Sequence, residues 1–157
     1  MSWLQQNWGN LASLAGLAFT IYVLLISKRA EHAANEAKRA IERKSVAGDL
    51  RGCIDEINLI NLFCGGGKWE IASFISNRLI QELTFISNRW ASLFDDDTKE
   101  ALNLLLTQLD TLNTQLRKFM NRPPKQTELD SLSSSILRIN KLLAAQVGIY
   151  ESQVDNQ

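Results

Sequence analysis

The feature that most constrains this chain is an uncharged, apolar segment at its N-terminus. No side chain in residues 1–27 carries a formal charge, and residues 11–26 read LASLAGLAFTIYVLLI. A helix needs roughly 20 mostly apolar residues to cross a bilayer, and counting from Trp8 supplies that length. Trp3 and Trp8 stand where aromatic side chains gather at a membrane interface. The segment therefore predicts a transmembrane anchor over residues 1–27.

Two other interpretations compete with the anchor. A cleaved signal peptide has a basic segment before its apolar run and a small-residue cleavage site after it. Here no Lys or Arg precedes the run, and Lys28 and Arg29 follow it directly. An apolar helix buried in a soluble core is the other alternative. The uncharged N-terminus and the basic flank favour a retained anchor over both.

The charges that follow the run predict how the anchor is oriented. Lys and Arg close to a span tend to remain in the cytoplasm. Basic residues outnumber acidic ones here: Lys28, Arg29, Lys38, Arg39, Arg43 and Lys44 stand against Glu31, Glu36 and Glu42. We therefore expect the N-terminus outside, the C-terminus in the cytoplasm, and a location in the inner (cytoplasmic) membrane of a prokaryote.

A helical rod is expected over residues 28–47, because this segment is rich in Ala, Glu, Lys and Arg, the best helix formers. Small residues recur at 3,4,3 spacing, as in a tightly packed coiled coil. These residues are Ala30, Ala33, Ala37 and Ala40, and Gly9, Ala12 and Gly16 supply a second small face in the anchor. The two faces predict self-association, and the hydrophobic helices of residues 49–157 predict further contacts between chains. We expect a homo-oligomer, a tetramer built as a dimer of dimers, that persists without residues 1–47. The alternative is that Ala merely fills a solvated helix.

The remaining residues, 48–157, predict an all-α cytoplasmic domain, a bundle of about four helices that follows the anchor and the rod. Apolar residues recur at helical spacing, and no segment shows convincing alternation of period two. Gly48 is expected to break or kink the chain, and helices are expected over residues 49–64 and 69–94. The expected core includes Leu50, Ile57, Ile60, Phe63, Ile71, Ile75, Leu79, Leu83, Ile86, Trp90, Phe94, Leu102, Leu105, Leu109, Leu112, Leu116, Phe119, Leu129, Leu132, Ile136, Ile139, Leu143, Val147 and Tyr150.

Glycine, proline and capping residues mark the expected helix ends. Residues 65–67 are three glycines and should end the first helix of the bundle. Residues 95–97 are three aspartates and form an expected N-cap cluster. Pro123 and Pro124 break the chain, and Thr127 with Asp130 resembles a capping pair.

Catalytic and metal-binding patterns are weak, so we expect no enzyme activity, no cofactor and no metal site. The single histidine, His32, falls in the rod. Cys53 and Cys64 are eleven residues apart on one helix and are expected to be packing residues. The aspartates at 95–97 are better explained by helix capping than by a bound cation.

One repeat is more specific. The pentapeptide Phe-Ile-Ser-Asn-Arg occurs at residues 74–78 and again at 85–89. An offset of eleven residues is close to three helical turns, so both copies should face nearly the same way with their arginines about 16 Å apart. Lys68 and Trp69 begin the same helix. Arginine, asparagine, an aromatic ring and a helix N-terminus are groups that bind phosphates and bases. The alternative is an amphipathic helix with Phe and Ile in the core and Asn-Arg at its wet edge.

A second basic patch follows the third expected helix. It comprises Arg117, Lys118, Arg122 and Lys125, with no acidic residue between Thr111 and Thr127. Three interpretations fit the patch: it faces anionic lipid headgroups, it binds a phosphate, or it keeps a loop soluble.

The layout of an uncharged anchor, a basic Ala-rich rod and a small helical domain, together with the Asn-Arg pairs, resembles the small single-pass membrane effectors of type III CRISPR defence. The resemblance implies that the cytoplasmic domain oligomerises, binds a cyclic oligoadenylate such as cyclic tetra-adenylate, and thereby disrupts the membrane of the infected cell. It would give Lys68, Arg78 and Arg89 to the phosphates, Asn77 and Asn88 to adenine edges or to bracing the site, and Trp69 to stacking. The balance of 17 basic against 17 acidic residues departs from what a polyanion receptor suggests.

The sequence thus leaves two hypotheses of function. The first is a non-enzymatic antiviral effector in the lipid bilayer, gated by a cyclic oligoadenylate. The second is a tethered helical scaffold that docks a partner protein through its leucine-rich surfaces. Both share one organisation: an anchor over 1–27, a rod over 28–47 and a helical domain over 48–157.

Overall fold

The computed structural model describes the backbone of residues 3–155 and the side chains of residues 13–153. The roles predicted for Trp3, Trp8, Gly9 and Ala12 fall outside the side chains that are described. Within residues 3–155 the chain forms four helices and no strand, which confirms the all-α prediction. The helices are α1 (Trp3–Gly65), α2 (Trp69–Arg89), α3 (Asp96–Asn121) and α4 (Gln126–Asp155).

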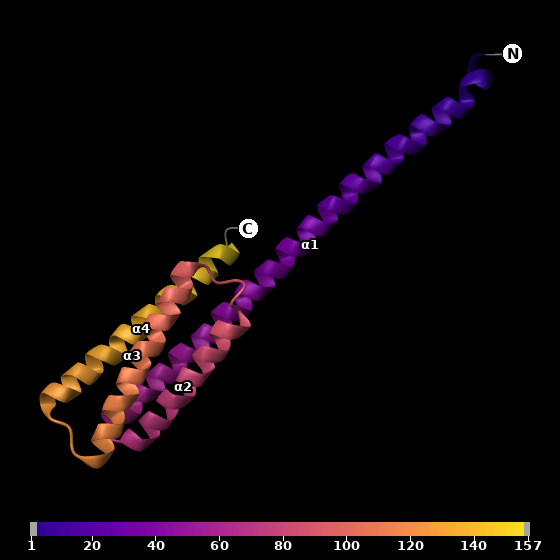
Figure 1. The fold of residues 1–157 in the computed structure, drawn as a ribbon. Helices are drawn as coiled ribbons and strands as arrows, with labels where there is room; N and C mark the ends of the chain where they lie inside the picture. The colour runs from indigo at the N-terminus through magenta and orange to yellow at the C-terminus, as the bar shows by residue number, and fades with distance from the viewer. Residues whose placement is uncertain (1–2, 156–157) are drawn as a thin grey trace. The chain divides into compact units, whose positions relative to one another are not determined.

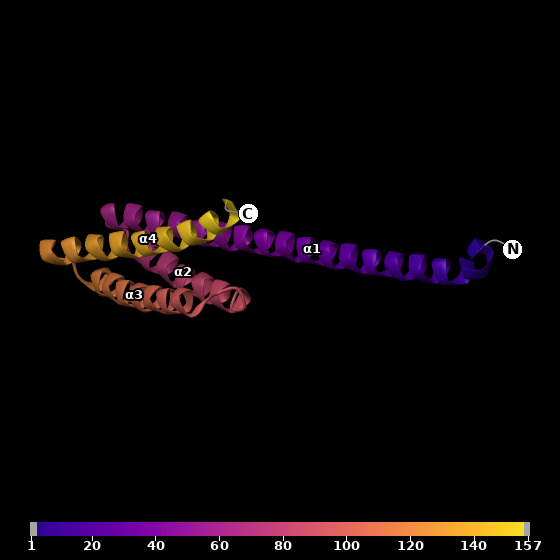
Figure 2. The same ribbon diagram turned by 90° about the horizontal axis from the view of Figure 1, so that it is seen from above.

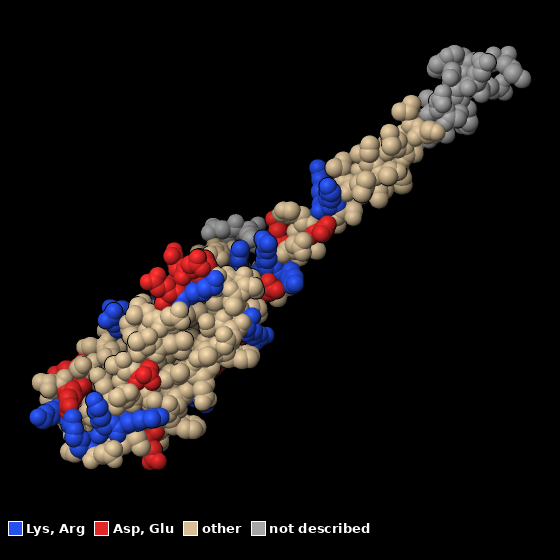
Figure 3. Space-filling model, in the orientation of Figure 1, with Lys and Arg blue, Asp and Glu red and all other residues tan. Residues whose placement is uncertain are grey.

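The chain divides into two compact units between Ile41 and Glu42. In the first unit, the side chains of α1 at residues 13–39 are exposed, and the apolar stretch carries no charge until the basic residues that follow it (Figure 3). Thr20 donates its hydroxyl proton to the carbonyl of Gly16 at 2.9 Å, so this polar group is satisfied within the helix. Of the helices in the described part of the chain, α1 is the one that is long and apolar enough to cross a membrane, and none of its most apolar stretch is buried.

The second unit is an up-and-down four-helix bundle (Figure 1). The part of α1 after residue 41 and the helices α2, α3 and α4 alternate in direction, so the turn at 66–68 and the linker at 122–125 share one end (Figures 1 and 2). Side-chain contacts place α1 between α2 and α4. Glu56 of α1 pairs with Arg78 of α2, and Asn58 of α1 accepts a hydrogen bond from Asn140 of α4 at 2.9 Å.

The core follows the apolar spacing of the sequence. The buried residues of α1 are spaced alternately by four and three positions, and six buried residues of α3 show the same alternating spacing. This spacing keeps one stripe of each helix facing the bundle axis. The stripes are Val46, Leu50, Cys53, Ile57 and Ile60 on α1 and Leu102, Leu105, Leu109, Leu112, Leu116 and Phe119 on α3. Ile75, Leu79, Leu83 and Ile86 of α2 and Leu132, Ile136, Ile139, Leu143, Val147 and Tyr150 of α4 complete the core.

The predicted helix ends are confirmed at two places. After α1, Gly67 adopts a positive φ of 68°, and the amide of Lys68 donates to the carbonyl of Phe63 at 2.9 Å, which closes the end of the helix. Before α3, the side chain of Asp95 accepts a hydrogen bond from the amide of Thr98 at 2.8 Å. Glycine and aspartate thus act here as their backbone preferences predict.

Two predictions about helix boundaries were wrong. Gly48 lies inside α1 and does not break it, because a helical glycine costs only about 1 kcal/mol and its neighbours Val46, Ala47 and Leu50 are buried in the bundle core. The second expected helix ends at Arg89 and not at residue 94. There the amide of Leu93 donates to the carbonyl of Trp90 at 2.8 Å, which turns the chain while Phe94 stays buried.

The start of α4 and one core position also differ from expectation. Thr127 lies within α4, and the helix start is capped instead by Glu128, whose carboxylate accepts a hydrogen bond from the amide of Lys125 at 2.8 Å. Asp130 accepts from the side chain of Gln126 at 3.1 Å. Ile71, expected in the core, is 42% exposed, because it lies in the first turn of α2, where it lines a shallow hollow at the end of the bundle.

Candidate functional site

Both copies of the Phe-Ile-Ser-Asn-Arg repeat lie in α2, and each copy distributes its side chains in the same way. Ile75 and Ile86 are buried, whereas Phe74 and Phe85 are 67% and 62% exposed. The phenylalanines therefore stand outside the core, which differs from the alternative that placed both Phe and Ile inside. The repeat brings two exposed aromatic rings to the outer side of the helix.

The arginines of the repeat point toward acidic residues of α1. Arg78 forms an ion pair and a hydrogen bond with Glu56. Arg89 lies 3.9 Å from the carboxylate of Asp49 and packs 4.6 Å from the ring centroid of Trp90. Both guanidinium groups thus have carboxylate neighbours in the same chain, although both side chains stay about half exposed.

The two asparagines of the repeat differ. Asn77 lies at the boundary with α3, where its side-chain oxygen accepts from Asn113 at 2.7 Å and from Arg117 at 3.4 Å. Asn113 in turn accepts from the hydroxyl of Ser73 at 2.8 Å. Asn88 is exposed at the other end of α2. Asn77 therefore helps to join α2 to α3, whereas Asn88 is open to solvent.

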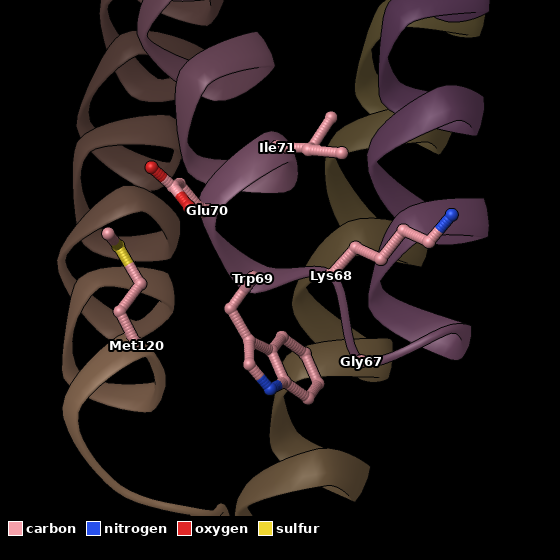
Figure 4. A pocket seen from close by; sticks show the side chains of 6 residues that line it. All are labelled: Gly67, Lys68, Trp69, Glu70, Ile71 and Met120. Carbon is pink, nitrogen blue, oxygen red and sulfur yellow. The ribbon is translucent and has the colours of Figure 1, made fainter.

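Lys68 and Trp69, at the start of α2, point away from each other (Figure 4). The ring of Trp69 packs edge-on against Phe119 of α3 at 5.4 Å between centroids. The amine of Lys68 lies 5.9 Å from the ring centroid of Phe63 on α1. Both residues line a shallow hollow of about 470 Å³ together with Gly67, Glu70, Ile71 and Met120 (Figure 4). The hollow combines one basic and one acidic side chain.

The six residues predicted to bind a ligand do not converge on one pocket within a chain. Helix α2 has 21 residues and spans about 30 Å, with Lys68 and Trp69 at its start and Asn88 and Arg89 at its end. Arg78 lies between them, on the side of α1. A ligand that touched all six residues would need to be as long as the helix or would need residues from several chains.

An acidic pair at the boundary of α1 and α2 was not singled out from the sequence. The Glu56 side chain is only 12% exposed, and the carboxylate oxygen that does not pair with Arg78 is buried. Burial raises the pKa of Glu82 above its usual range, and the charge of Glu56 and a hydrogen bond to it raise this pKa further. Two carboxyl groups in contact favour sharing a proton. The sequence did carry a signal for Glu56. Glu56 immediately precedes a core residue, as does Asp49 seven residues before it, and an acidic residue at this spacing lies at the edge of the buried stripe of α1.

The basic residues near the linker are mostly engaged in local contacts. Arg122 donates to Glu128 at 2.8 Å, and this contact lowers the pKa of Glu128 to about 2. Arg117 donates to Asn77. Lys118 and Arg122 line a polar hollow of about 220 Å³ at this end of the bundle. Figure 3 shows basic and acidic side chains gathered together there, so this end carries mixed charge.

The cysteines and the histidine show no reactive arrangement within the described residues. Cys53 is buried and Cys64 is half-buried, and both are free thiols. Burial raises the pKa of Cys53 to about 12 and that of Cys64 to about 11, which suits packing residues better than nucleophiles. His32 lies 3.2 Å from Glu36 in the N-terminal unit. No cluster of three or more His, Cys, Asp or Glu capable of holding a metal occurs in the described part of the chain.

An exposed apolar surface follows the outer side of α1 and α2. Glu56 and Arg78 mark where the two helices meet, and residues at steps of three, four or seven from them share their faces. By this spacing, Gly52 and Leu59 flank Glu56, and Ile71, Phe74 and Phe85 flank Arg78, with Leu62 one turn beyond Leu59. We call this surface the α1/α2 face; it consists of Gly52, Leu59, Leu62, Ile71, Phe74 and Phe85, and all six are exposed.

The sequence did not predict the α1/α2 face. The apolar spacing of α2 predicts Ile71 in the core, and the phenylalanines stand out in the sequence only as members of the repeat. Their spacing from Arg78 was a usable signal. Ile71 and Phe74 precede Arg78 by seven and four residues, and Phe85 follows it by seven. That spacing places large apolar side chains on a charged face of the helix.

Comparison with protein-family models, with curated proteins and with solved structures finds no match for this chain.

Proposed function

We propose that this protein is a single-pass, membrane-tethered helical bundle whose function is to bind a protein partner through the α1/α2 face. The observation that supports the proposal is the exposure of five large apolar side chains on neighbouring faces of two packed helices. Phe74 and Leu62 are 67% and 68% exposed. Large apolar side chains exposed together on one side of a folded domain are typical of protein interaction sites. In this proposal Arg78 is a polar position within the surface, and Arg89 lies at its end.

The tether places the bundle on one side of a membrane. The apolar stretch of α1 is followed by Lys28 and Arg29, and such a basic flank favours the cytoplasmic side. We therefore propose that the N-terminus lies outside and the bundle lies in the cytoplasm of a prokaryotic cell. An alkaline phosphatase fused after Gln157 is expected to be inactive, and a fluorescent reporter at the same position is expected to be active. The opposite pattern would place the bundle outside.

Site-specific photocrosslinking in the native membrane tests the docking face. A photoreactive amino acid replaces Phe74 or Phe85 in the full chain, and a matched control replaces Leu137, which is 56% exposed on α4. We expect a discrete protein crosslink from positions 74 and 85 and none from position 137. Equal labelling at all three positions, or no protein crosslink at positions 74 and 85, contradicts the proposal.

A second candidate function is the cyclic oligoadenylate effector that the sequence resembles. The observation that favours it is that Arg78 and Arg89 stand on one side of α2, about 16 Å apart, with half-exposed guanidinium groups. Several chains together could bring these arginines around one polyanion, which would take the place of Glu56 and Asp49. Binding would then favour one arrangement of the chains, and the anchors would transmit it to the bilayer.

Direct binding tests this candidate. Full-length protein in detergent is titrated with cyclic tetra-adenylate, and Arg78→Ala and Arg89→Ala are each expected to weaken binding at least tenfold, or about 1.4 kcal/mol. Arg138→Ala is the matched control, since Arg138 is an exposed arginine of α4. Absence of binding at micromolar ligand, or equal effects of all three substitutions, rules out this site.

A further inference from the structure

The register of α1 against α2 places each phenylalanine of the α1/α2 face level with a particular part of α1. Two contacts fix this register, one between Glu56 and Arg78 and one between Asp49 and Arg89. Because the helices are antiparallel, a step forward on α1 meets a step backward on α2. Leu59 therefore lies level with Phe74. By the same argument, Phe85 lies level with Gly52.

Phe85 and Gly52 have complementary sizes. A Cβ atom added to Gly52 would meet nothing within 4 Å, so the backbone of α1 is open to close approach at this point. The phenylalanine beside it is 62% exposed and offers a large ring. At the other end of the face, Phe74 stands level with the exposed side chains of Leu59 and Leu62. The α1/α2 face thus carries an exposed ring, Phe85, and an open stretch of backbone at Gly52 against which such a ring can pack. The two lie at the same level along the bundle.

The proposed membrane tether favours a second copy of the chain as the partner that pairs Phe85 with Gly52. Two copies tethered in one membrane by the same end of the chain can pair in parallel, and a twofold axis along the bundle then brings equal levels of the two chains together. Phe85 of one chain then faces Gly52 of the other, and Phe74 faces Leu59 and Leu62. Confinement to a membrane also raises the effective concentration of each copy for the other.

Charge and area agree with this arrangement. Asp55 is exposed on the outer side of α1, one position from Glu56, and no hydrogen bond or ion pair of its carboxylate occurs among the described residues. It therefore lies level with the half-exposed Arg78 of a parallel copy. Residues 42–65 of α1 span about 35 Å, and two packed helices are about 20 Å wide, so the side of the bundle that carries the α1/α2 face covers about 700 Å². Stable protein interfaces bury about 800 Å² on each partner.

We propose that the α1/α2 face is a parallel homodimer interface, in which Phe85 of each chain packs over Gly52 of its partner and Phe74 packs against the partner's Leu59 and Leu62. This inference rests on the proposed docking function and specifies its partner as a second copy of the chain. It assigns the exposed aromatic rings of the repeat to self-recognition.

Cysteine crosslinking of the full chain in native membranes tests the geometry. Two tagged copies are co-expressed, one with Gly52→Cys and one with Phe85→Cys, both with Cys64→Ser; Cys53 is buried and stays unreactive. A short bismaleimide is expected to join the two different tags. The control pair, Leu104→Cys with Leu137→Cys, places exposed apolar positions on α3 and α4 and is expected to give no dimer.

A second measurement separates this interface from association through the anchor. In lipid nanodiscs, subunit exchange between fluorescently labelled copies is expected to show dimers that Phe85→Glu weakens at least tenfold, whereas Leu137→Glu leaves them unchanged. Far-ultraviolet circular dichroism checks that both variants stay helical.

The outcomes distinguish this inference from the proposed function. A dimer that is insensitive to Phe85→Glu, or a crosslink from positions 74 and 85 to a protein of another mass, overturns the homodimer and leaves the docking function standing. Absence of any protein crosslink from positions 74 and 85 overturns both. A Gly52–Phe85 crosslink together with loss of the dimer in Phe85→Glu supports both.

Discussion

Asn113 is the polar residue on which the boundary of α2 and α3 most depends. It is 5% exposed and accepts from Ser73 while it donates to Asn77. Asn113→Ala leaves the buried hydroxyl of Ser73 without a partner, and such a loss costs about 1–3 kcal/mol. We expect a decrease of about 2 kcal/mol in the free energy of unfolding, measured by urea denaturation. Asn103→Ala, at an exposed position of the same helix, should change it by less than about 0.5 kcal/mol.

Two carboxyl groups should give stability opposite dependences on pH. Burial and the charge of Glu56 raise the pKa of Glu82, so the folded state disfavours the ionised Glu82 carboxylate. The resulting loss of stability grows as pH rises above the unfolded pKa of Glu82, and Glu82→Gln should therefore stabilise the bundle at pH 8 but not at pH 4.

The pKa of Glu128 is lowered to about 2 by Arg122, so the stabilising contribution of the Glu128 carboxylate is present above pH 4.5 and is lost toward pH 2. Glu128→Gln should therefore destabilise at pH 7 and become neutral near pH 2. Urea midpoints measured across pH check both signs; equal pH profiles for the two variants contradict the assignment.

At the scale of an element, the ends and interiors of helices respond differently to one substitution. Gly67 has a φ of 68°, which an alanine adopts only at a cost of about 1–2 kcal/mol. Gly148 lies inside α4, and an added Cβ there meets nothing within 4 Å, so alanine should stabilise the helix by about 0.5–1 kcal/mol. We expect Gly67→Ala to lower the thermal midpoint and Gly148→Ala to raise it. Two shifts of the same sign would mean that the turn after α1 is not held in this conformation.

At the scale of the whole molecule, the bundle has its own core and should fold without the N-terminal unit. The buried residues begin at Val46, and the second compact unit begins at Glu42. A fragment of residues 42–157 is expected to be soluble, strongly helical by circular dichroism and cooperative in urea unfolding. The companion fragment 48–157 removes Val46 and Ala47 from the core and should lose about 2 kcal/mol or more. Equal stability of the two fragments would show that the core begins after residue 48.

The candidate site shows which of its properties depended on contacts between helices. The spacing of the repeat placed Arg78 and Arg89 on one side of α2, because eleven residues complete about three turns. Their carboxylate partners were not evident, since Glu56 and Asp49 belong to a helix that precedes α2 in the chain and meets it only after the chain turns at residues 66–68. The six predicted ligand-binding residues were chosen by chemistry, and the length of α2 is what separates them.

The sequence by itself determined the helical class, the long apolar N-terminal helix, the capping at Gly67 and Asp95, and most of the core, because each depends on backbone preference or on spacing within one helix. Only the tertiary structure decided that α1 continues through Gly48 and that Ile71, Phe74 and Phe85 stay outside the core. The physical reason is that residues at the two edges of a helix's buried stripe are covered only where a neighbouring helix packs closely against them. An apolar residue at such an edge is therefore buried or exposed according to the position of that neighbour, which the spacing within one helix does not specify. In this bundle, α1 meets α2 through the side chains of Glu56 and Asp49, and the apolar residues beside Arg78 therefore remain exposed.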